Sequence, residues 1–336
     1  MIIDNRYELY NIDTLVHTDH GEQISRFPEE VRQGMLPAGR DTAALSATGS
    51  EIRFVMLDGC DTVKLHVTCL EPFMVVQLCF GSFQGGWKYL YVRGLMTGEN
   101  ELTIERPQNI EELRKAAQER SHPFSPDVMR ICFRSGAIAN IRLEGDIRPP
   151  QPEEVPSKRI LFYGSSITHG SLSYLPCNDY ASVICQRLGM DCINKGCAGS
   201  CRLEQSVASY IAERNDYEFC VFELGSNIPG EISGDEFMHS VKNLLTGYMK
   251  AHPNRGAIVI DDLLILRPEH HQRHEQVRQC LAEVNHPRFL YVDGYDLLPS
   301  PDLICADFVH PTVEGHQVLA NALLQQIQLL REIKND

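Results

Sequence analysis

Long hydrophobic runs and excess positive charge are both missing from this chain of 336 residues. Its most apolar stretch, residues 73–83, is interrupted by Gln77 and Gly81, and no run approaches the roughly 18–20 apolar residues that span a bilayer. Basic residues number 31 against 45 acidic ones, and the net charge is −14. Nucleic-acid backbones and anionic membrane surfaces attract proteins of the opposite sign. We therefore expect no nucleic-acid partner and no membrane partner.

The N-terminus also lacks the basic and apolar regions of a secretory signal. The 12 cysteines are scattered, and no Cys-x-x-Cys occurs. These features predict a cytoplasmic protein with reduced thiols and no disulfides, although the mature form of an exported precursor would look similar. Cys192, Cys197 and Cys201 are close in sequence, and we interpret them as side chains that pack beside the loop at 194–199 rather than as zinc ligands.

Residues 1–150 are predicted to form an all-β, jelly-roll-like sandwich. Short runs of alternating apolar and polar residues recur at 51–57, 63–67, 74–78 and 87–92, with turns such as Asp58-Gly59 between them. A helix near 110–120 interrupts the pattern, and two strands follow at 128–133 and 139–144. Alternation places Trp87, Tyr89 and Tyr91 on one strand face, where a core position is favoured over a sugar-stacking platform.

Residues 157–336 show a different pattern, in which predicted strands alternate with predicted helices. A joint containing Pro149, Pro150, Pro152 and Pro156 separates the two regions. Strands are expected at 159–163, 191–194, 219–224, 257–260 and 289–292, with helices that include 180–188 and 313–333. This pattern predicts a three-layer α/β/α, flavodoxin-like domain with a parallel sheet. Ligands in such domains bind at the carboxyl ends of the strands.

Candidate catalytic residues follow the expected strands. The first strand leads into Gly164-Ser165-Ser166-Ile167-Thr168, where a serine would face helix N–H groups. An alternative interpretation of this loop is a plain helix cap. Before the last helix lies Asp307-Phe308-Val309-His310, whose spacing lets the carboxylate reach the imidazole Nδ1 and leave Nε2 free as a base.

The C-terminal region resembles the SGNH hydrolases, also called GDSL-type esterases, and the layout with a preceding sandwich is similar to two-domain carbohydrate acetyl-esterases. Gly164–Thr168 looks like the first block of that family, residues 194–199 like the second, Gly225-Ser226-Asn227 like the third and residues 307–311 like the fifth. The resemblance implies Ser166 as nucleophile, His310 as base and Asp307 as its orienting carboxylate. It implies an oxyanion hole made by Ser166, Gly199 and Asn227. Two positions depart from the family pattern: Ser165 replaces an aspartate, and Ile228 replaces the aspartate that follows the asparagine.

Other histidines are weighed against these candidates. His169 follows Ser166 by three residues and is a conceivable rival base, but no carboxylate near it in sequence could orient it. His270, His271 and His274 have spacing that could bind a metal, but without acidic or thiol partners beside them a solvated helix face is favoured. No metal site is therefore predicted.

The sequence predicts a serine esterase that needs no cofactor and acts on a small-molecule or carbohydrate ester. Short, half-polar loops at 169–179 and 228–235 offer no apolar lid, which favours acetyl over longer acyl groups. One alternative is a catalytically silent carbohydrate-binding protein on the same scaffold. Another is a nucleotide-binding domain, which the absence of Gly-x-Gly-x-x-Gly and of Gly-Lys-Ser/Thr disfavours. The pattern does not indicate an oligomeric state.

Overall fold

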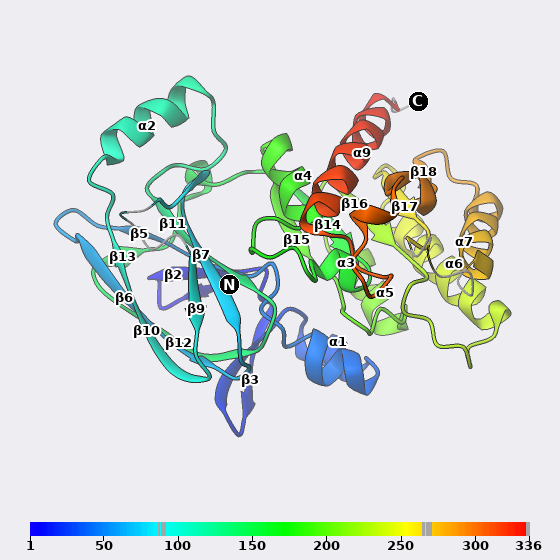
Figure 1. The fold of residues 1–336 in the computed structure, drawn as a ribbon, viewed down its shortest axis with the longest axis horizontal. Helices are drawn as coiled ribbons and strands as arrows, with labels where there is room; N and C mark the ends of the chain where they lie inside the picture. Colours follow the sequence, from blue (N-terminus) through cyan, green and yellow to red (C-terminus); the bar gives the residue numbers. More distant parts are fainter. Residues whose placement is uncertain (87, 89–91, 264–265, 267–270, 334–336) are drawn as a thin grey trace.

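The computed structural model of the protein describes residues 1–86, 88, 92–263, 266 and 271–333. Two antiparallel sheets lie within residues 1–148, and a parallel sheet with helices on both faces lies within residues 159–332. The predicted fold class is confirmed, and the two parts form adjacent lobes (Figure 1). Within the described residues, no helix has both the length and the apolar character needed to cross a membrane.

The N-terminal lobe contains an eight-stranded and a five-stranded sheet. The larger sheet runs in the order β1 (Ile2–Ile3), β2 (Tyr7–Tyr10), β5 (Glu51–Met56), β11 (Val128–Arg134), β7 (Met74–Phe80) and β8 (Phe83–Gln84), with β13 (Ile147–Arg148) beside β5 and β9 (Val92–Leu95) beside β7. The smaller sheet runs in the order β10 (Gly98–Glu105), β6 (Thr62–Cys69), β12 (Ile138–Glu144), β4 (Gly21–Ser25) and β3 (Thr14–Thr18). Helix α2 (Ile110–Glu119) follows β10.

Alternation along the strands produces the sandwich core. On β6, Val63, Leu65 and Val67 are buried while residues between them are more exposed, and on β11 Met129 and Ile131 enter the same core. Trp87, Tyr89 and Tyr91 lie outside the described residues, so the prediction about their strand face stays a prediction.

The opposite face of the larger sheet is buried as well, but it is polar. Arg53 on β5 and Arg130 on β11 are paired across the strands, and both guanidinium groups bind the Glu51 carboxylate. Arg53 also binds Asp191, at the start of β15 in the other lobe, through two hydrogen bonds of 2.6 and 2.8 Å. This face therefore contacts the other lobe through the buried Arg53–Asp191 ion pair.

The C-terminal lobe is built on five parallel strands. They run in the order β15 (Asp191–Asn194), β14 (Arg159–Tyr163), β16 (Phe219–Glu223), β17 (Ala257–Ile260) and β18 (Phe289–Val292), and each strand lies within one residue of its predicted range. Connections between parallel strands carry helices, which cover both faces.

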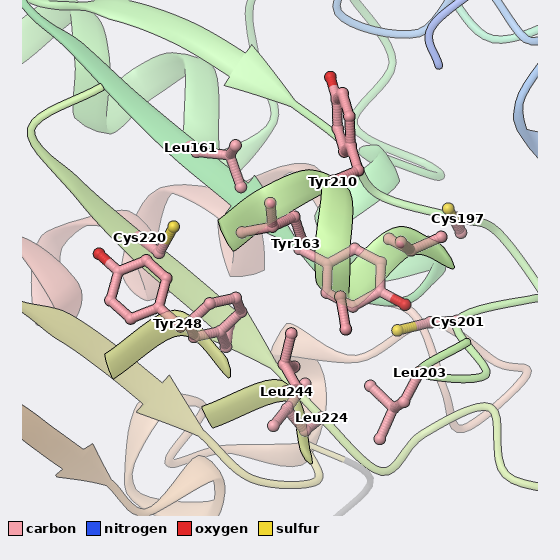
Figure 2. Packing of buried hydrophobic residues seen from close by; sticks show 14 of the residues in the cluster. Leu161, Tyr163, Cys197, Cys201, Leu203, Tyr210, Cys220, Leu224, Leu244 and Tyr248 are labelled. Atoms are coloured by element: carbon pink, nitrogen blue, oxygen red, sulfur yellow. The ribbon is translucent and has the colours of Figure 1, made fainter. Parts of the chain in front are cut away.

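The two faces of the parallel sheet have separate cores. Leu161 and Tyr163 of β14 pack under α5 (Gln205–Glu213), α6 (Gly234–Ala251) and α7 (His271–Val284), as Figure 2 shows for the first two helices. Ile160 and Phe162, the alternate residues of the same strand, pack under α4 (Tyr180–Leu188) and α9 (Val313–Glu332). A continuous apolar strand is buried on both sides in this way.

An early segment of the chain crosses from the first lobe to the second. Helix α1 (Glu29–Gln33) lies against α5 (Figure 1), the helical turn Gly39–Ala43 contacts α1, and Phe27 packs edge-on against Tyr210 at a centroid distance of 5.5 Å. Residues 27–44 thus contribute to the core of the parallel-sheet lobe, although they precede most of the sandwich in sequence.

Candidate active site

Three of the predicted site residues form one hydrogen-bonded chain. Ser166 Oγ lies 2.8 Å from His310 Nε2, and His310 Nδ1 lies 2.7 Å from Asp307 Oδ2. Ser166 is buried, whereas 42% of the Asp307 side chain is exposed. A hydroxyl, an imidazole and a carboxylate in this order can pass a proton from the hydroxyl to the ring while the carboxylate stabilises the resulting cation.

The nucleophile loop is shaped by a short helix directly after β14. Helix α3 (Ser166–His169) begins at the candidate serine, and its N-cap Ser165 accepts a hydrogen bond from Ile167 N through Oγ. Gly170 ends the helix with φ +88°, a conformation that favours glycine. Ser166 is thereby held at the carboxyl end of a parallel strand, where the fold places ligands.

A closed loop before α9 holds the other two members. Cys305 N donates to His310 O at 2.8 Å, which closes residues 305–310 into a compact turn. Asp307 Oδ1 accepts the backbone N–H groups of Val309 and His310, so Oδ2 is left to accept from the ring. Partial burial disfavours the charge, but the hydrogen bonds from His310 and the backbone lower the pKa of Asp307 to about 2. The carboxylate stays charged at neutral pH.

The residues expected to form the oxyanion hole lie on two further loops. Gly199 follows β15 with φ +64°, and Asn227 follows β16. Asn227 Oδ1 accepts the N–H of Cys201 at 3.2 Å, and the NH₂ group of the same amide has no acceptor among the described residues. The backbone N–H groups of Ser166 and Gly199 donate to no acceptor within the described part of the chain.

Arg26 fixes the loop that carries Gly199, and sequence reasoning did not identify it. This fully buried side chain donates to Asn194 O and Gly196 O, each at 2.8 Å, and also to Ser46 O and Ala43 O. The guanidinium has five donors and so can satisfy several buried carbonyls at once. The N-terminal part of the chain therefore shapes the loop after β15.

Glu223 is a second residue that the sequence analysis missed. It ends β16, is fully buried, and its Oε2 accepts hydrogen bonds from the N–H and the hydroxyl of Ser165, both at 2.7 Å, and from Thr168 Oγ1 at 3.1 Å. Burial raises the pKa of Glu223, and the bonds from Ser165 oppose that rise. With serine in place of the family's aspartate at 165, Glu223 supplies a carboxylate under the nucleophile loop. The sequence did carry one signal for this role, because Glu223 is the one acidic residue in the otherwise apolar run 219–224.

His169, the rival base, has other contacts. Its Nδ1 lies 3.2 Å from Gly196 O and its Nε2 lies 3.4 Å from Ser46 Oγ, so neither ring nitrogen is directed to Ser166. Burial and the nearby Arg26 charge lower the pKa of His169 to about 3. A neutral, buried imidazole packed between the lobes fits these contacts better than a base.

The expectation of a solvated face is wrong for His274. The side chain is buried, its Nδ1 lies 2.8 Å from Asp261 Oδ2, and its ring stacks on Tyr295 at 4.4 Å. Asp261 follows β17 and was too distant in sequence to be recognised as a partner. Asp261 also accepts hydrogen bonds from Tyr291 Oη and Gly294 N, which ties this group to β18 and α8 (Gly294–Leu297). His271 is exposed, and His270 lies outside the described residues.

All 12 cysteines are free thiols. Cys197 and Cys201 lie in the core beneath α5 and α6 (Figure 2), which agrees with the packing interpretation. A different trio, Cys79, Cys132 and Cys177, converges between the lobes. Its members are far apart in sequence, so spacing alone could not reveal it.

A parallel α/β/α domain with a Ser–His–Asp chain at its strand ends is the architecture of a carboxylic ester hydrolase. The chain belongs to the GDSL-like lipase/acylhydrolase family, whose sequence model matches residues 157–327. The resemblance inferred from the four motif blocks is thus confirmed. No curated protein matches the sequence.

Several solved structures share the fold of nearly the whole chain. The salicylyl-acyltransferase SsfX3 of a tetracycline biosynthetic pathway is similar at 15% identity with a TM-score of 0.73, covering 98% of this chain and 96% of its own. A family two carbohydrate esterase from Cellvibrio japonicus is similar at 11% identity with a TM-score of 0.62, covering 97% and 96%. An acetyl xylan esterase from Butyrivibrio proteoclasticus is similar at 12% identity with a TM-score of 0.55, covering 98% and 96%.

Proposed function

We propose that the protein is a serine esterase that hydrolyses short-chain acyl esters, chiefly acetyl esters, of a carbohydrate or another small polar alcohol. The hydrogen-bonded chain from Ser166 through His310 to Asp307 is the observation that carries this proposal. The mechanism uses protein groups alone and needs no cofactor.

In the first half-reaction, Ser166 Oγ attacks the ester carbonyl while His310 Nε2 takes the hydroxyl proton. Asp307 keeps the ring oriented and stabilises the imidazolium. The tetrahedral intermediate collapses, the bond to the alcohol breaks, and His310 returns its proton to the leaving oxygen. Water then attacks the acyl-enzyme with His310 again as base, which releases the acid and restores Ser166.

The negative charge of the intermediate needs donors that are already in place. We assign this task to the N–H groups of Ser166 and Gly199 and to the Asn227 side-chain amide. The bond from Cys201 N to Asn227 Oδ1 supports the assignment because it fixes the amide through its oxygen, and the NH₂ group is then the part of the side chain that can donate to an oxyanion. Preorganised donors act on charge that develops only in the transition state, so they raise kcat.

Replacing Asn227 with alanine is expected to lower kcat by roughly 10²–10³-fold with little change in KM, because one oxyanion donor is lost. Steady-state kinetics with p-nitrophenyl acetate measure both constants. Asn215→Ala is the matched control, since Asn215 is an exposed residue between α5 and β16. A kcat for Asn227→Ala close to that of the control would remove Asn227 from the oxyanion hole.

The two segments that follow the strand ends support a short acyl group. The segment between α3 and α4, residues 170–179, and the segment between β16 and α6, residues 224–233, contain no helix that could close over a long chain. Each buried methylene of an acyl chain contributes about 0.8 kcal/mol only if apolar surface covers it. A hydroxyl-rich alcohol suits the polar groups near the strand ends. The carbohydrate esterases among the similar structures act on alcohols of that class, which we extend to this protein.

A series of p-nitrophenyl esters tests the acyl preference. We expect kcat/KM to be highest for acetate and to fall through butyrate to octanoate, because longer chains leave methylenes in water. A Ser166→Ala variant measured in parallel corrects for background hydrolysis. A kcat/KM that rises steadily from acetate to octanoate would refute the short-acyl preference while leaving esterase activity intact.

The alternative of a silent carbohydrate-binding protein is distinguished by the same experiment. Such a protein would turn over none of the esters, and acetylated sugars added to the panel would be bound but not deacetylated. The intact Ser166–His310–Asp307 chain favours the active enzyme.

A further inference from the structure

Three thiols from separate parts of the chain meet between the two lobes. Cys79 lies on β7, Cys132 lies on β11, and Cys177 lies in the segment between α3 and α4. The three Sγ atoms are within 4.8 Å of one another, and each residue is at most 8% exposed. The group is therefore a compact, buried set of sulfur atoms rather than a line of separate core residues.

The geometry of the larger antiparallel sheet places two of these thiols together. Arg130 pairs with Cys79 and Cys132 pairs with Gln77, so the two cysteines are diagonal neighbours on the polar face of the sheet. The third thiol comes from the other lobe, where Cys177 N donates to Gln77 Oε1 at 3.4 Å. This bond holds the segment after the nucleophile helix against the sheet.

A cavity of about 290 Å³ adjoins the trio and is lined by all three cysteines and by Cys185 and Cys192. Such a volume admits an ion with water molecules, so the sulfur atoms are accessible from within the protein. Arg130 lines the same cavity, and its guanidinium charge acts on Cys79 and Cys177. Glu51 lines the same cavity and is hydrogen-bonded to that guanidinium, so Arg130 lies beside the trio as one half of an ion pair.

We propose that Cys79, Cys132 and Cys177 bind one soft metal ion with a filled d shell, Zn²⁺ or Cu⁺. Thiolate sulfur prefers such ions over the harder Mg²⁺ and Ca²⁺. Three sulfur ligands complete a trigonal site for Cu⁺, whereas tetrahedral Zn²⁺ would take a water molecule from the cavity as its fourth ligand. Binding replaces three S–H bonds with three metal–sulfur bonds and releases three protons, so no oxidant or reductant is involved.

The proposed ion would connect the two lobes. Two of its ligands belong to the sandwich, and the third belongs to residues 170–179, which directly follow α3. The role is structural and is independent of the proposed esterase mechanism, because the hydrogen-bonded chain consists of Ser166, His310 and Asp307 and uses none of the three thiols.

Titration of the reduced, metal-free full-length protein with Cd²⁺ under argon tests the proposal. Cd²⁺ reports on thiolate sites through an ultraviolet charge-transfer absorption. We expect this absorption to saturate at one equivalent per chain and to be lost on adding Zn²⁺ or Cu⁺ in separate competition arms. Whichever ion competes more strongly is the preferred occupant. No saturable binding, or no competition from either ion, would overturn the proposal.

Serine variants locate the ligands. Cys132→Ser and Cys177→Ser should each weaken Cd²⁺ binding by more than the roughly 10–100-fold that loss of an outer-shell partner costs. Cys192→Ser removes a thiol from the same cavity, and Cys280→Ser removes a buried thiol of α7, and both should bind Cd²⁺ like the wild type. If Cys192→Ser loses binding while Cys132→Ser and Cys177→Ser retain it, the assignment is wrong.

A measurement on the unaltered protein covers the case in which a variant does not fold. Thiol modification followed by peptide mass spectrometry should be slower with Cd²⁺ at Cys79, Cys132 and Cys177 and unchanged at Cys185 and Cys192. Equal protection of all five, or protection of the last two alone, would contradict the proposed ligand set. A disulfide within the trio of the freshly purified protein would also contradict it.

Discussion

Ser166→Ala is expected to lower kcat/KM for p-nitrophenyl acetate by roughly 10⁴-fold or more, leaving only the contribution of binding and of the oxyanion donors. Without the hydroxyl no acyl-enzyme can form, and His310 has no proton to accept. His310→Ala should have a similar effect, and the double variant should be little worse than either single one, because residues that act as a unit are not additive.

Ser171→Ala is the matched control for this experiment. Ser171 lies five residues after Ser166, and its backbone N–H binds Ser166 O, but its side chain is not part of the hydrogen-bonded chain. We expect near wild-type kinetics from the control. Turnover by Ser166→Ala at the level of Ser171→Ala would rule out Ser166 as the nucleophile and with it the proposed mechanism.

Arg53→Ala is expected to destabilise the protein by about 3–5 kcal/mol, the usual cost of breaking a buried ion pair. The Arg53 side chain is 1% exposed, binds the 4%-exposed Asp191 side chain through two hydrogen bonds, and lies 3.5 Å above the centre of the Tyr10 ring. Its removal leaves the Asp191 carboxylate buried without that partner, and Glu51 retains only Arg130.

The free energy of unfolding of three variants, measured by chemical denaturation, isolates the contribution of the Arg53–Asp191 pair. Arg53→Ala and Asp191→Ala should each be strongly destabilised, and the double variant should lose less than the sum, because the second change removes a charge that the first left unpaired. Arg278→Ala, whose exposed guanidinium pairs with Glu275, should change stability little. If Arg53→Ala matched that control, the Arg53–Asp191 ion pair would contribute little to the stability of the protein.

The fold and the hydrogen-bonded chain of Ser166, His310 and Asp307 could be predicted because their determinants are local. Each parallel strand is a short apolar run bounded by turn residues, and each candidate catalytic residue lies shortly after a strand or shortly before a helix. Since the carboxyl ends of parallel strands share one edge, the loops that carry Ser166 and Asn227 were expected at the same edge of the sheet once the strands were assigned. The proximity of Asp307 and His310 follows from their spacing of three residues.

The partners that come from distant segments could not be predicted. Glu223 lies under Ser165 because β16 is the neighbour of β14. The sequences of the two strands do not predict that they are neighbours. His274 was expected to be solvated because Asp261 approaches it only in the folded sheet. The trio of Cys79, Cys132 and Cys177 depends on antiparallel register and on contact between lobes. The sequence spacing of residues that lie far apart in the chain does not predict such contacts.

Arg26 makes the loop that carries Gly199 depend on a side chain from the N-terminal part of the protein. The proline-rich joint near residue 150 suggests that the triad-bearing part could be moved into another protein or produced alone. A fragment starting there would leave Asn194 O and Gly196 O without their buried donor, and the loop bearing Gly199 would lose its anchor. The first 45 residues are therefore part of the same folding unit as the parallel-sheet lobe. If that lobe were transferred to another protein without them, the loop that carries Gly199 would lack the Arg26 contacts.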